Sequence, residues 1–234
     1  MSLEAQGYSI VSIPALTNVP PSDLLHAWVG LSRGMFEEKR GKGRWEWTDV
    51  PTPYIWMARR SVNTQQRYTL RPQVGRSSWW SILLDDIWSS IEPTVQAQVT
   101  PLCANARLHS INLMLVEPGA ASQQWHCDYY TSRSVGKSET FFTVIVPLTT
   151  NGAAAGGTVL CPESHLWDLS AKDVVRQAES MISAWVTIPS QRGQIYLFNG
   201  NVAHAGLANN TSHETRVFAY YVFGHITTDP NLGH

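Results

Sequence analysis

The sequence predicts a mainly β (α+β) fold, in which a sandwich or barrel of short strands carries helices on its outer face. The second half of the chain alternates short apolar runs with Gly, Asn and Pro turn signals, a spacing typical of such sheets. Helical periodicity precedes it within residues 20–95, and helices before a β core pack on its face. The 234 residues suffice for one core. We therefore expect a single domain over residues 1–234, with a helical and loop-rich part, 1–100, packed on a core at 101–227.

Two helices and a connecting loop are expected in the first part. One helix begins near Ser22 after two prolines and covers residues 23–31, and another covers residues 78–99, where apolar side chains recur at helical spacing. Residues 40–56 are polar, aromatic and broken by prolines, which predicts a loop with short strands that covers a site. Seven of the ten tryptophans precede residue 100. They either pack the core or form the wall of a pocket for a bulky apolar substrate.

Strands dominate the second part. The runs are rich in β-branched and aromatic residues and are bounded by turn residues. One helix, over residues 170–185 with Ser170 as its cap, interrupts them. The expected strands lie within residues 107–119, 141–150, 156–162, 185–190, 193–200 and 216–224.

Composition excludes several classes of protein. The net charge of −1 and pI of about 6.7 leave no basic patch for nucleic acid. The uncharged apolar runs are far shorter than a membrane span, and the first residues lack the basic and apolar segments of a signal peptide. Three cysteines without a CxxC pair indicate no disulfide framework. We therefore expect a cytoplasmic protein without a membrane or nucleic-acid partner.

A candidate metal site comes from three side chains. His126 and Asp128 are two residues apart, so on an extended strand both point to one face. His204 follows 78 residues later, just after another expected strand. Two histidines and one carboxylate that bind one face of an ion form the facial triad of non-haem Fe(II) oxygenases, which leaves positions open for a cosubstrate and O₂. Zn or Mn would also fit these ligands, and a hydrogen-bonded surface histidine is the plain alternative.

An arginine near this motif indicates a carboxylate ligand. Arg216 follows His204 by twelve residues and opens the last expected strand. A guanidinium at the mouth of an apolar barrel needs an anion, and its planar fork binds a carboxylate through two hydrogen bonds. The far carboxylate of 2-oxoglutarate would satisfy it, while the keto-acid end chelates the metal. The alternative is an ordinary salt bridge to Glu214 or another acid.

Three stretches within residues 112–223 resemble the signature blocks of the phytanoyl-CoA dioxygenase-like family of Fe(II)/2-oxoglutarate-dependent oxygenases. They are PGAASQQWHCDYY, AAAGGTVLCPESHLW and HAGLANNTSHETR, in the family's order and with compatible spacing. The resemblance covers about half the chain. It implies a double-stranded β-helix, also called a jelly roll. It also implies that His126, Asp128 and His204 bind Fe(II) and that Arg216 binds 2-oxoglutarate.

The resemblance implies further cosubstrate contacts and shows two departures. Gln123 and Thr158 match positions beside the cosubstrate, and Asn112 is expected to point inward from the preceding strand; each of these polar groups could instead pair with backbone. Glu163 replaces the family's common glycine, which should change a turn. Asp128 is present where halogenating relatives have a small residue, so halogenation is disfavoured. Cys127 and Tyr129 should alternate away from the iron, and Tyr130 towards it.

The expected function is oxidation of a C–H bond in a small, hydrophobic organic molecule, such as one of secondary metabolism, with release of succinate and CO₂. Hydroxylation, desaturation, ring formation and rearrangement stay open. So do a metal-dependent cupin-like isomerase or hydrolase, a protein hydroxylase, and a non-catalytic binding protein on the same fold. Succinate release would separate the oxygenase from the isomerase or hydrolase.

Overall fold

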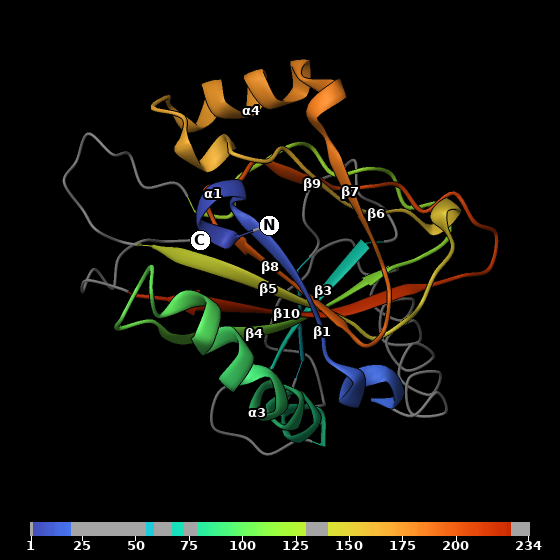
Figure 1. The fold of residues 1–234 in the computed structure, drawn as a ribbon. Helices are drawn as coiled ribbons and strands as arrows, with labels where there is room; N and C mark the ends of the chain where they lie inside the picture. The colour runs from blue at the N-terminus through green and yellow to red at the C-terminus, as the bar shows by residue number, and fades with distance from the viewer. Residues whose placement is uncertain (1, 20–54, 59–66, 73–78, 130–139, 226–234) are drawn as a thin grey trace.

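Two antiparallel sheets packed face to face form the core of the protein (Figure 1). The computed structural model describes residues 2–19, 55–58, 67–72, 79–129 and 140–225. The large sheet runs in the order β1 (Tyr8–Ser12), β8 (Gln194–Asn199), β5 (Phe141–Pro147), β10 (Arg216–Gly224), β4 (Arg107–Val116), β3 (Arg67–Pro72) and β2 (Ile55–Ala58). The small sheet has the order β7 (Val186–Pro189), β6 (Gly157–Leu160) and β9 (His204–Gly206).

The two faces of the large sheet are buried against different partners. On β10, Val217, Ala219 and Tyr221 belong to the outer core beneath α3 (Trp79–Val99), whereas Phe218 belongs to the inner core between the sheets. Both faces are covered, so almost every residue of β10 is buried. Because side chains alternate along a strand, the even-numbered residues of β10, Arg216 among them, point into the barrel.

Helix α3 covers the outer face of the large sheet. Trp88 packs on Tyr221 and Phe223, with ring centroids 5.1 and 5.5 Å apart, and the Tyr221 hydroxyl donates to the carbonyl of Leu84 at 3.0 Å. The helix predicted over residues 78–99 is therefore confirmed, and Trp88 is a core residue. Trp28, Trp45 and Trp47 lie outside the described residues, as do the side chains of Trp56, Trp79 and Trp80.

The second helix, α4 (Ala171–Ser180), lies above the small sheet (Figure 1). The Ser170 side chain accepts the N–H of Asp173, which confirms the predicted cap. The helix ends at Ser180, and a 3-10 turn, Ile182–Ala184, follows it. Val174 and Ala178 pack with Cys161 and Ala203. Each strand predicted in the second part contains one of β4, β5, β6, β7, β8 and β10.

The first part of the chain contributes more strands than the sequence indicated. β1 pairs with β8, and β2 and β3 extend the sheet beyond β4. The short helix α1 (Leu3–Gln6) precedes β1, and further 3-10 turns cover Pro14–Asn18, Ala153–Ala155 and Ser164–Leu166. The helix expected over residues 23–31 lies outside the described residues, as does the loop expected over 40–56 except for residues 55 and 56, which belong to β2. None of the described helices is long and apolar enough to cross a membrane.

Glu163, which replaces the family's common glycine, lies in a tight turn. Glu163 has φ of 64°, the left-handed conformation that glycine adopts without cost. Glu163 therefore occupies a backbone conformation that a glycine would favour. The Glu163 carboxylate accepts from the Gln6 amide at 3.0 Å, and its N–H donates to the Gln6 carbonyl at 3.0 Å, which anchors the turn beside α1.

Candidate metal centre and carboxylate pocket

His126 and His204 come together through the backbone. Their N–H and carbonyl groups exchange two hydrogen bonds of 2.9 Å, which form an isolated bridge at the edge of the small sheet. The sequence predicted a regular strand through His126 and Asp128, but only His126 pairs, and Asp128 already lies in a bend. The bridge fixes the positions of two histidines that are far apart in the sequence, and the bend brings the carboxylate back towards them.

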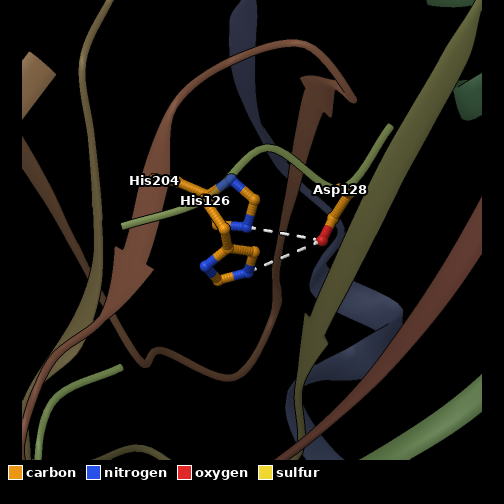
Figure 2. Close-up of side chains that lie close together, drawn as sticks. All are labelled: His126, Asp128 and His204. Carbon is orange, nitrogen blue, oxygen red and sulfur yellow. Dashed lines mark ion pairs between the residues drawn. The ribbon is translucent and has the colours of Figure 1, made fainter. Parts of the chain in front are cut away.

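The three side chains converge on one point (Figure 2). Asp128 Oδ1 lies 3.7 Å from His126 Nε2 and 3.6 Å from His204 Nε2, and one ligand atom from each residue lies within 4.8 Å of the other two. Donors that share one metal ion, with bonds of about 2.0–2.2 Å, stand at most about 4.3 Å apart. Both measured distances satisfy that limit.

Backbone carbonyls set the orientation of both imidazole rings. His126 Nδ1 lies 2.8 Å from the carbonyl of Gln124, and His204 Nδ1 lies 3.0 Å from the carbonyl of Val202. A carbonyl can only accept, so each Nδ1 carries a proton, and Nε2, which lies on the side of Asp128, is the nitrogen left to bind a metal. Such contacts behind the ligands fix the tautomer and ring angle that a metal needs.

The three ligand side chains differ in exposure. His204 is 5% exposed and packs against Phe198, whereas the side chains of His126 and Asp128 are 29% and 20% exposed. Two neutral imidazoles and one carboxylate are the donor set that suits Fe(II) with open positions. The residues present therefore fit an iron ion, which His126, Asp128 and His204 would hold.

A fourth residue touches this centre, and sequence reasoning missed it. Thr143, on β5, donates from its hydroxyl to Asp128 Oδ2 at 2.6 Å and is itself 2% exposed. Thr143 lies fifteen residues beyond Asp128 in an apolar run, and no sequence motif there indicates a contact with the metal ligands. Only the pairing of β5 between β8 and β10 reveals its place.

Cys127 and Tyr129, beside the ligands, contact residues other than the three ligands. The Cys127 thiol donates to the carbonyl of Asn201 at 3.4 Å and packs near Cys161 beneath α4. Burial, and then the charge of Asp128, raise the pKa of Cys127 to about 12, so it stays a thiol. Tyr129 stacks on Phe141, with ring centroids 4.4 Å apart. Tyr130 lies outside the described residues.

Arg216 lies in a desolvated position at the start of β10. It is 2% exposed and donates to the carbonyls of Ala155 at 2.9 Å and Leu207 at 3.3 Å. Burial lowers the pKa of its guanidinium to about 10, so it keeps its charge at neutral pH. Among the described ion pairs none involves Arg216. The Glu214 carboxylate instead accepts from the Asn151 amide and from Gly152 N–H, each at 3.3 Å.

A pocket between the sheets contains the Arg216 side chain. Thr158, on β6, lines the same pocket, so the structure places two of the predicted cosubstrate residues together. Tyr196 and Ser190 also line it, and the sequence gave no signal for either. The other lining residues are mostly apolar and comprise Ile145, Pro147, Gly157, Ile188, Pro189 and Phe218.

The two remaining predicted residues occupy different settings. Gln123 pairs with Gly206 through its own N–H at 2.8 Å and through its side-chain carbonyl, which accepts at 3.0 Å. Its side-chain amide is therefore oriented by β9, directly beyond His204. Asn112 is 1% exposed and donates to the Ser110 hydroxyl at 3.1 Å, while its Oδ1 has no hydrogen-bond partner among the described residues.

Comparison with known proteins agrees with this geometry. Residues 63–218, more than half of the chain, match the model of the family described as phytanoyl-CoA dioxygenase (PhyH). The dioxygenase aneA of Aspergillus aculeatus is 29% identical over 114 residues, which cover 47% of this chain and 37% of that protein. The match thus spans just over a third of the fungal relative's length.

Solved structures show the same fold. AviO1 from Streptomyces viridochromogenes superposes with a TM-score of 0.62 at 16% identity, covering 97% of this chain and 94% of its own. The epimerase SnoN, in complex with Fe³⁺, alpha ketoglutarate and nogalamycin RO, gives a TM-score of 0.59 at 16% identity, covering 99% of this chain and 89% of its own. The core is therefore the expected jelly roll.

The chain belongs to the phytanoyl-CoA dioxygenase family, as its sequence blocks indicated. The family's description is that of a dioxygenase, and the His126–Asp128–His204 set, which could hold a metal ion, agrees with it.

Proposed function

We propose that this protein is an active Fe(II)/2-oxoglutarate-dependent dioxygenase that oxidises a C–H bond of a small, hydrophobic organic molecule. Succinate and CO₂ are released in the same turnover. One observation carries the proposal: a convergent His126–Asp128–His204 set occurs in the same barrel as a buried arginine to which no described acid is paired. A metal centre alone would serve a hydrolase or an isomerase, but a desolvated guanidinium calls for an anionic ligand.

The residues divide the work between two ends of the cosubstrate. His126, Asp128 and His204 would hold Fe(II), which supplies the redox chemistry that activates O₂ at the expense of 2-oxoglutarate. Arg216 would bind the far carboxylate, with the Thr158 hydroxyl beside it in the pocket. The Gln123 amide, held by Gly206, would contact the cosubstrate near His204. Asn112 would offer a further polar contact inside the barrel.

The substrate class follows from the composition of the interior and from the relatives. The inner face of the large sheet carries Met114, Ile145 and Phe218, so an apolar molecule is favoured over a charged one. SnoN acts in nogalamycin biosynthesis, and its complex contains nogalamycin RO. We therefore propose an oxidation within natural-product biosynthesis, carried out by the whole chain as one domain.

The decisive experiment measures succinate. Purified protein with Fe(II), 2-oxoglutarate and O₂ should release succinate, faster when a substrate from a natural-product panel is present. Anaerobic addition of Fe(II) should give a weak visible charge-transfer band only when 2-oxoglutarate is also present. The Asp128→Ala variant should lose both signals. Absence of the band in the unmodified protein, together with no succinate from any substrate, would overturn the proposal.

A further inference from the structure

We propose that Thr143 is a positioning residue that fixes the orientation of the Asp128 carboxylate, so that Oδ1 alone is presented to the metal. The inference rests on the proposed metal site and deepens it. It adds a residue of β5 that lies outside the three signature blocks.

The two oxygens of Asp128 have different surroundings. Oδ1 faces Nε2 of His126 and of His204, at 3.7 and 3.6 Å. Oδ2 accepts the hydroxyl hydrogen of Thr143 at 2.6 Å, within the short range of hydrogen bonds to an ionised acceptor. A lone pair of Oδ2 is thus occupied by the Thr143 hydroxyl, and rotation of the carboxylate would break that bond.

The position of the Thr143 side chain is fixed by the large sheet. It is 2% exposed on β5, and its backbone pairs with Val222 on one side and Phe198 on the other. Threonine is branched at Cβ, which restricts its χ1 angle on a strand. Asp128, in contrast, lies in a bend outside any strand. The large sheet therefore supplies a rigid reference for a ligand whose own backbone is irregular.

The number of open coordination positions explains why this orientation matters. Fe(II) held by His126, His204 and one oxygen of Asp128 would keep positions for the cosubstrate and O₂. A carboxylate that bound through both oxygens would take one of those positions. A hydroxyl that holds Oδ2 opposes this second bond and keeps the position available.

The test compares metal binding by matched variants, using Mn(II) as a spectroscopic probe without 2-oxoglutarate. Thr143→Val keeps the shape and removes the hydroxyl, whereas Thr143→Ser keeps the hydroxyl. Loss of a contact behind a metal ligand typically weakens metal binding about 10–100-fold. We expect that loss in the Thr143→Val variant and affinity within about threefold of the original in Thr143→Ser. Thr187→Val, on the exposed face of β7, is the control and should leave the affinity unchanged.

A second readout concerns the open positions. Under anaerobic conditions with saturating Fe(II), Thr143→Val should need a higher 2-oxoglutarate concentration to develop the charge-transfer band, and Thr143→Ser should not. Thermal unfolding of the metal-free variants checks that the fold is kept. Mn(II) affinity of Thr143→Val within twofold of the original would overturn the inference, as would equal losses in the Val and Ser variants.

The failure of this inference differs from failure of the proposed function. If the unmodified protein and Asp128→Ala bind Mn(II) equally weakly, the metal site itself is wrong. If Asp128→Ala loses binding and Thr143→Val does not, the metal site stands and only the role of Thr143 is refuted.

Discussion

The two ends of the proposed cosubstrate site are built in contrasting ways. At the metal end, His126 and Asp128 are partly exposed and lie outside regular strands, and their orientation depends on hydrogen bonds to Gln124 and Thr143. At the carboxylate end, Arg216 begins a central strand, is 2% exposed and donates to the carbonyls of Ala155 and Leu207. Hydrogen bonds to partly exposed ligands thus define the metal end, whereas burial of the guanidinium defines the carboxylate end.

This contrast teaches how each ligand is selected. A metal ion gains most from donors at fixed angles, so backbone carbonyls and one hydroxyl orient the rings and the carboxylate. An anionic carboxylate gains most from a charge that has lost its water, because the interaction strengthens as the local dielectric falls. Variants at the two ends should therefore separate metal binding from 2-oxoglutarate binding.

The largest effect is expected at the metal end. His126→Ala removes one of three donors and should weaken Mn(II) binding by at least about 100-fold, because loss of a hydrogen bond behind a metal ligand alone costs about 10–100-fold. Isothermal titration would measure the affinity, and succinate formation should fall to background. His213→Ala, which removes an exposed histidine, is the matched control and should change neither quantity. Retained turnover in His126→Ala would contradict the ligand assignment.

Arg216→Met should produce the next effect, restricted to 2-oxoglutarate. Loss of charged hydrogen bonds of about 1.5–3 kcal/mol in total predicts a rise in the 2-oxoglutarate dissociation constant of about 10–150-fold, with Mn(II) affinity kept. Arg216→Lys should recover part of the affinity, because it keeps the charge but lacks the planar fork. Arg107→Met, at the exposed start of β4, serves as control. Equal loss of metal binding would show that the two ends are not separable.

Gly156→Ala should weaken the carboxylate end through geometry. Gly156 has φ of +74°, and an added Cβ would lie 2.3 Å from the Ala208 carbonyl and 2.8 Å from Arg216 Nη1. We expect a loss of stability of about 1–3 kcal/mol and weaker 2-oxoglutarate binding, with Mn(II) binding little changed. Gly152→Ala is the control, since nothing lies within 4 Å of its added Cβ. Similar behaviour of the two variants in unfolding and 2-oxoglutarate titrations would refute this prediction.

The smallest effect is expected where neither end is touched. Glu163→Gly removes the cost of a left-handed residue, about 1 kcal/mol, and should raise the melting temperature by about 2–4 °C. Glu163→Ala loses the same contact with Gln6 but keeps a Cβ. The difference in melting temperature between the two variants therefore measures the cost of the left-handed backbone alone. If the melting temperature of Glu163→Ala equals or exceeds that of Glu163→Gly, the positive φ of this turn carries no strain.

The sequence was most informative where local pattern and chemistry coincide. The helical spacing over residues 78–99 and the cap at Ser170 were predicted because they depend on neighbours in the chain. β1 was not predicted, because a five-residue edge strand has little signal of its own and forms by pairing with β8. Ser190 and Tyr196 were missed for a related reason, since they reach the Arg216 pocket only through the packing of two sheets.

By itself the sequence determined the donor types, their order and the family. His126, Asp128, His204 and Arg216 were all singled out, because imidazole, carboxylate and guanidinium groups have few other uses in apolar surroundings. Only the tertiary structure decided how they are held: the bridge between His126 and His204, the hydroxyl of Thr143 on Asp128, and the burial of Arg216 without a described acid. Chemical identity is carried by each residue, whereas orientation and desolvation are properties of contacts between residues far apart in the chain.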